Sequence, residues 1–171
     1  MNTLEKLIQI AQDENITIDY TDYLPYNLEG LHINLEGIGH IISILHRVKN
    51  DKDKYIEILG EELGHYFTSV GDNLIKVDSY RDYLKICKTE KKALDWSVNV
   101  IIKNSDLERA FKNNCASYYD VAEFLNVPEK LVREKFKYLA SKNINGYVSL
   151  GEYKVILTNL PNVLIYKNFN Y

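Results

Sequence analysis

The 171-residue sequence predicts an α+β fold with a small N-terminal antiparallel sheet, a helical body and a C-terminal β-hairpin. Two observations predict this class. Strand-like runs lie near the two ends of the chain, at 16–44 and 147–166, and the residues between them carry apolar side chains at helical spacing. Because the strand-like and helical stretches are segregated along the chain, they are typical of an α+β domain.

The first fifty residues predict one helix and three strands. Apolar residues recur at helical spacing in 3–13, whereas 16–20 alternates between apolar and polar residues, and Pro25 then marks a break. The runs 31–35 and 40–44 flank a short turn that contains glycine, as in a β-hairpin. Together these runs predict the three-stranded N-terminal sheet.

The middle of the chain predicts helices that share a start signal and apolar positions at helical spacing. They are a helix that starts at the end of the charge run 50–54 and continues to about Phe67, a helix at about 79–103, a short helix from Ser105, a second short helix from Ser117, and a helix from Pro128 to about Ser141. Ser105 and Glu108 have the spacing of a capping box. Core candidates of the helix at 79–103 are Tyr83, Ile86, Ala93, Trp96, Val100 and Ile101.

The composition predicts one compact domain, or a domain with a small appendage, because 46% of the residues are apolar and 26% are charged. A net charge of −3 argues against a strongly basic nucleic-acid binder. No apolar run approaches the roughly 20 residues of a membrane span, and the N-terminus does not resemble a signal peptide. Cys87 and Cys115 form no CxxC pair, so we expect reduced thiols in a cytoplasmic protein.

The stretch 58–71 carries the chemistry: Ile-Leu-Gly-Glu-Glu-Leu-Gly-His-Tyr-Phe-Thr-Ser-Val-Gly. On a helix, Glu61 and His65 are four residues apart and share a face, and Glu62 lies at the edge of that face. This is the spacing of the HExxH metal helix with Glu61 at the position of the first histidine. A carboxylate is also a zinc ligand, so the substitution permits a metal site.

Two glycines distinguish this helix from an ordinary solvent-exposed helix. Gly60 and Gly64 lie inside it, and each costs about 1 kcal/mol relative to alanine. Their spacing predicts a strip where another backbone packs closely. The alternative interpretation leaves Glu61 and Glu62 in water and His65 at a helix end, where its charge favours the helix dipole.

The best candidate for a third metal ligand is Glu90. It begins an E-x-x-A-x-x-W pattern that places Ala93 on the same face and permits close approach. Asp82 and Asp95 are weaker alternatives. Zinc is the metal we expect, although a Glu/Glu/His ligand set is permissive and admits another divalent transition metal.

These residues resemble the ImmA/IrrE family of zinc metallopeptidases, from the N-terminal helix to about residue 141. The similarity is carried by 61–71 and by the pattern from Glu90 to Trp96. It implies a gluzincin-like helical core and an endopeptidase that cleaves a helix-turn-helix repressor of a phage or mobile element. It also implies that His65 and Glu90 are metal ligands and that Glu62 is the general base. Glu61 stands at the first ligand position, where the fuller family motif has histidine.

The resemblance predicts two parts: a metallopeptidase-like core at 1–104, and a helical subdomain with C-terminal strands at 105–171. In the second part, 119–139 has the apolar spacing of a helix-turn-helix, and we favour a packing or docking role over DNA binding. A DNA-binding regulator using 117–166 is the alternative, although we expect no nucleic-acid partner. A second alternative is a catalytically impaired relative that binds a repressor without cleaving it.

Histidines outside the motif are expected to lie at the surface or to be half-buried. Alternatively, one of His32, His40 and His46 replaces the missing ligand. His46, just before the metal-motif helix, is the favoured one of the three.

Overall fold

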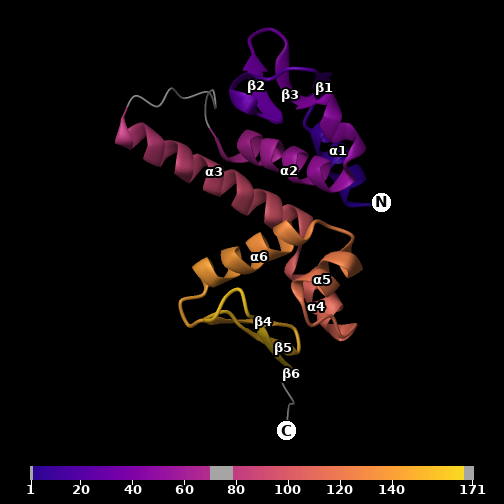
Figure 1. The fold of residues 1–171 in the computed structure, drawn as a ribbon, viewed down its shortest axis with the longest axis vertical. Coiled ribbons are helices and arrows are strands. Elements are labelled where there is room, and N and C mark those ends of the chain that lie inside the picture. The colour runs from indigo at the N-terminus through magenta and orange to yellow at the C-terminus, as the bar shows by residue number, and fades with distance from the viewer. Residues whose placement is uncertain (1, 70–78, 168–171) are drawn as a thin grey trace. The chain divides into compact units, whose positions relative to one another are not determined.

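The computed structural model describes residues 2–69 and 79–167 and has the α+β class predicted from the sequence (Figure 1). The chain divides into two compact units, Met1–Ser97 and Val98–Tyr171. The division falls inside α3 (Tyr80–Ile101), seven residues before the boundary expected from the sequence. Within the described residues, no helix combines the length and the apolar character that a membrane span requires.

The first unit contains α1 (Thr3–Asp13), α2 (Lys52–Thr68) and a three-stranded sheet of β1 (Thr17–Thr21), β2 (Gly30–Leu35) and β3 (Gly39–Leu45). The strand order is β1-β3-β2, and β2 and β3 form the expected antiparallel hairpin. The expectation of a wholly antiparallel sheet is wrong, because β1 pairs with β3 in parallel. The connection after β1 passes through a 3-10 turn at Pro25–Asn27, so β2 forms the far edge and β3 returns beside β1.

Helix α2 packs against α1 and the sheet through its apolar face. Its N-cap is Asp51, whose Oδ1 accepts a hydrogen bond of 3.1 Å from the Lys54 N–H. The fully buried side chains of this core come from α1, β3 and α2: Leu7, Ile42, Ile44, Ile56, Leu59 and Leu63. These contacts fix the helix that carries the sequence motif against the sheet.

The second unit contains α4 (Asn104–Lys112), α5 (Tyr118–Leu125), α6 (Glu129–Lys142), β4 (Tyr147–Leu150), β5 (Tyr153–Ile156) and β6 (Leu164–Lys167). Its sheet is antiparallel with the order β4-β5-β6, so the expected hairpin is joined by a strand at the last part of the strand-like stretch predicted at 147–166. Helices α5 and α6 are joined by a turn in which Asn126 adopts a left-handed conformation, with φ of 53°.

Some local expectations for the helices are confirmed and others are wrong. The capping box predicted from Ser105 is wrong: Ser105 lies inside α4, and Asp106 Oδ2 accepts the Lys103 N–H at 2.9 Å. On α3, Ala93 and Ile101 are buried as expected, whereas Tyr83 is 52% exposed.

The second unit also buries one charged side chain. Lys135 on α6 is only 2% exposed, and its Nζ donates to Asn99 Oδ1 at 2.7 Å. Burial lowers the pKa of this amine to about 8, because the charged form loses its hydration.

Candidate metal centre

Three side chains converge on one point in the first unit. Glu61 and His65 lie one turn apart on α2, and Glu90 reaches them from α3. One donor atom from each of the three lies within 4.8 Å of the others, and His65 Nε2 is 3.4 Å from Glu90 Oε2. The group can therefore hold a metal ion, and it consists of the three ligands proposed from the sequence.

Close packing of α3 on α2 brings Glu90 to this point. A Cβ on Gly64 would lie 2.3 Å from the carbonyl oxygen of Ala93, so only glycine permits this approach. One turn further along, the rings of Phe67 and Trp96 stack at 4.6 Å between centroids. Gly64 therefore marks the strip of close backbone contact that the sequence predicts.

One edge of this group has a length that a metal ion could span. Ligand atoms at about 2.0–2.1 Å from zinc are separated by about 3.4 Å along a tetrahedral edge. The 3.4 Å between His65 Nε2 and Glu90 Oε2 equals that edge. One imidazole and two carboxylates are ligand types that zinc accepts, and three protein ligands leave a fourth position open.

Glu62 lies beside this group but faces the sheet. Its Oε2 accepts a hydrogen bond of 2.8 Å from the backbone N–H of His32 on the edge strand β2. Burial raises the pKa of the Glu62 carboxyl to about 7, against the opposing effects of His65 and of the His32 hydrogen bond. A carboxylate with a pKa near neutrality is suited to accept and return a proton at neutral pH.

His65 on α2 and Glu90 on α3 shift each other's pKa. Hydrogen bonding to His65 lowers the pKa of Glu90, although partial burial opposes this effect. Burial alone would lower the pKa of His65, but the surrounding carboxylates, led by Glu90, raise it overall. The Nδ1 atom of His65 is buried and has no hydrogen-bond partner among the described residues.

The structure places the alternative ligands away from the metal group. His46 is wrong as a replacement ligand, because its Nδ1 pairs with Asp22 at 3.0 Å and its ring stacks on Tyr20. Asp82 accepts a hydrogen bond from Ser79 at 2.6 Å, and Asp95 pairs with Lys91.

A histidine pair beside the site has no sequence signature. His32 is buried, its Nε2 lies 3.0 Å from His40 Nδ1, and the two rings stack. The ring of Tyr66 makes a T-shaped contact with each of the two imidazole rings. Burial, followed by the neighbouring His40 and His65, lowers the pKa of His32 to about 4, so this ring is neutral at physiological pH. Only the β2–β3 register, which places His32 opposite Ile42 and Asn34 opposite His40, brings these residues together.

No family model matches the chain, and neither a curated protein nor a solved structure matches it.

Proposed function

We propose that this chain is a metal-dependent endopeptidase, with zinc held by Glu61, His65 and Glu90. The convergence of one imidazole and two carboxylates within 4.8 Å carries this proposal. The residue types of the triad are ones that zinc accepts, and Glu62 stands next to it in the sequence and in space.

The proposed mechanism uses Glu62 as the proton carrier. A bound zinc ion supplies Lewis acidity, which acidifies water and polarises a peptide carbonyl. Glu62 removes a proton from the attacking water and later delivers it to the leaving amine. The His32 N–H donates to Glu62 Oε2 and so fixes the position of this carboxylate.

The substrate class follows from the resemblance to the ImmA/IrrE family. We propose a helix-turn-helix transcriptional repressor of a phage or mobile element, whose cleavage ends repression. The residues that support this extension are those of 61–71 and the Glu90, Ala93 and Trp96 pattern.

A peptide-library digestion tests the activity. Wild-type protein and Glu62→Gln, each loaded with one equivalent of zinc, are incubated with a proteome-derived peptide library, and new termini are identified by mass spectrometry. We expect cleavage by the wild type and by the control Glu123→Gln, which changes an exposed carboxylate in the other unit. Glu62→Gln should retain zinc and lose cleavage, and equal cleavage by this variant would contradict the proposal.

The second candidate function is a relative that binds a repressor without cleaving it. The presence of Glu61 at the first ligand position favours this alternative, because a second carboxylate makes the site more anionic than the His/His/Glu set. Zinc binding by the wild type without cleavage of any library peptide would support it.

A further inference from the structure

The N-terminal half of α3 carries an exposed apolar band, formed by Tyr80, Tyr83, Leu84 and Cys87. Tyr80 is 76% exposed, Tyr83 is 52% exposed and Leu84 is 39% exposed. The sequence predicts Tyr83 as a core residue, so the band has the composition of a buried helix face but lies at the surface. A contiguous exposed apolar surface indicates an interaction site, whereas a single exposed apolar residue does not.

The apolar band leads to the metal group along one side of the helix. Tyr83, Cys87 and Glu90 are spaced by four and three residues, which places them within about 60° around the helix axis. The ring of Tyr80 stacks on that of Tyr83 with 6.3 Å between centroids, and the Cys87 side chain hydrogen-bonds to the Tyr83 side chain. A continuous surface of side chains therefore leads from Tyr80 to the proposed ligand Glu90.

The metal group is most exposed where it meets this band. The Glu90 side chain is 48% exposed, whereas the His65 side chain is 7% exposed. Glu61 is half-buried. Because the most exposed ligand is the one that adjoins the band, a polypeptide bound at the metal group can continue along α3.

Helix geometry sets the length of this continuation. A rise of about 1.5 Å per residue places Tyr83 about 10 Å and Tyr80 about 15 Å from Glu90 along the helix axis. An extended chain advances about 3.4 Å per residue. The two rings therefore lie opposite residues that are about three to five positions from the residue at the metal group.

Basic side chains border the apolar band. Residues 80–92 contain five Lys or Arg and two Asp or Glu, a net charge of +3, within a first unit whose net charge is −6. Arg81, Lys88 and Lys92 are exposed, and none of them forms an ion pair with another described residue. Lys88 follows Leu84 by one helical turn, so it lies at the border of the band. This border favours an acidic residue beside apolar ones.

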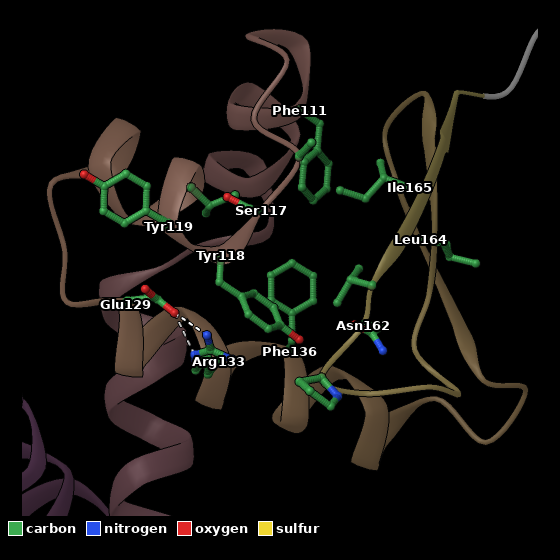
Figure 2. Close-up of a pocket in the computed structure, with 14 residues that line it drawn as sticks. Phe111, Ser117, Tyr118, Tyr119, Glu129, Arg133, Phe136, Asn162, Leu164 and Ile165 are labelled. Atoms are coloured by element: carbon green, nitrogen blue, oxygen red, sulfur yellow. Dashed lines mark hydrogen bonds and ion pairs between the residues drawn. The ribbon is translucent and has the colours of Figure 1, made fainter.

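The pocket of the second unit shows no such preference. Its volume is about 770 Å³, and its walls are mostly apolar. Figure 2 shows its two charged residues, Arg133 and Glu129, paired with each other, so its lining carries no net charge. The metal group lies in the other unit.

We propose that the exposed side of α3 between Tyr80 and Lys88 binds the polypeptide substrate on one side of the scissile bond. The proposal rests on the peptidase function and names the chemistry of its substrate. An aromatic or branched apolar residue, three to five positions from the scissile bond, packs on the two tyrosine rings. An acidic residue beside it pairs with Lys88.

Alkylation of Cys87 tests this binding without metal or cleavage. A displayed library of random peptides is selected on the zinc-free full chain, and we expect enriched peptides with an acidic residue beside an aromatic or branched apolar residue. A bulky maleimide on Cys87 covers the band, so it should weaken peptide binding at least about tenfold. The same treatment of Cys87→Ser, which labels only Cys115, should leave binding unchanged.

Two charge reversals on α3 provide a matched comparison. Lys88→Glu changes the border of the band, whereas Lys92→Glu makes the same charge change about 40° further around the helix from Leu84. We expect a loss of about tenfold in peptide affinity for Lys88→Glu and little change for Lys92→Glu. Equal losses in the two variants would contradict the Lys88 contact.

Cleavage specificity tests the position of the band relative to the scissile bond. In the library digestion, wild-type cleavage sites should show the apolar and acidic preference three to five positions from the cut, on one side only. Tyr83→Ser should lose this preference and still cleave. An unchanged preference in Tyr83→Ser would contradict the proposal.

Three other outcomes would overturn the proposal. They are the enrichment of no peptide, peptide binding that is unaffected by alkylation of Cys87, and concentration-dependent dimerisation that competes with the peptide. Peptide binding at Cys87 without any cleavage would instead count against the peptidase function alone. Failure of this proposal is therefore distinguishable from failure of the proposed function.

Discussion

Replacement of Gly64 by alanine tests whether close helix packing builds the metal centre. The new Cβ would lie 2.3 Å from the Ala93 carbonyl oxygen, 2.7 Å from the carbonyl carbon and 2.8 Å from Cα. Ordinary contact begins at 3.4 Å, so α2 and α3 must separate by about 1 Å at this point. All three neighbours are backbone atoms, which prevents relief by a side-chain rotation.

The cost has two terms with opposite signs. Overpacking costs about 1–3 kcal/mol, and the higher helix propensity of alanine returns about 1 kcal/mol. Because the clash is with backbone, we expect the upper part of this range and a net loss of about 2 kcal/mol in unfolding free energy. A shift of about 1 Å also exceeds the tolerance of about 0.2 Å in metal–ligand distances, so zinc affinity should fall at least tenfold.

Two measurements separate these effects. Urea denaturation of zinc-free protein reports the packing cost, and competition with a chromophoric chelator reports zinc affinity. Unchanged stability together with unchanged zinc affinity would refute the reasoning, because the helices would then have accommodated a methyl group without moving Glu90 from His65.

Three further changes test other parts of the molecule. Zinc at 100 times its Kd should raise the unfolding free energy of the wild type by about 2.7 kcal/mol in a denaturation assay. His65→Ala should abolish this gain. An equal gain in the variant would show that zinc binds at another site. Gly30→Ala would place a Cβ 2.9 Å from Glu62 Cγ and 2.4 Å from Ile58 Cγ2. It should therefore displace Glu62 and lower library cleavage more than tenfold, with zinc content unchanged; full activity would show that the position of Glu62 is not critical. Lys135 has a pKa of about 8 in the folded chain and a reference value of 10.5, so between these pH values the unfolded state binds the additional proton. Stability should rise with pH across this window by up to about 3 kcal/mol relative to Lys135→Met, and parallel pH profiles of the two proteins in urea denaturation would contradict the assignment.

The sequence was sufficient to predict most elements and the members of the metal group. Helical spacing places Glu61 and His65 on one face, and the alanine and tryptophan after Glu90 predict which face of α3 approaches. Both patterns are local and follow the helical period, so they can be recognised in the sequence without knowledge of the tertiary fold. Gly64 added a long-range constraint, because a glycine inside a helix requires a close neighbour to offset its cost.

The remaining features depend on pairings that no local pattern encodes. The parallel pairing of β1 with β3 is set by the path of the chain through Pro25–Asn27. The contact between the His32 N–H and Glu62 joins residues 30 positions apart and uses a backbone donor, which has no side-chain signature. The histidine pair depends likewise on strand register.

Helix α2 makes contacts around much of its circumference between Ile58 and Thr68. Ile58 and Glu62 face Gly30, Gly64 faces Ala93, and Tyr66 donates to Glu14. The apolar side binds the core, and Phe67 stacks on Trp96. Most helices tolerate mutation with a period of 3.6 residues, because one side faces water. In this stretch Phe67 is the one exposed residue, at 40%, and the others are buried or half-buried, so a scan of all substitutions should show intolerance that does not follow the 3.6-residue period.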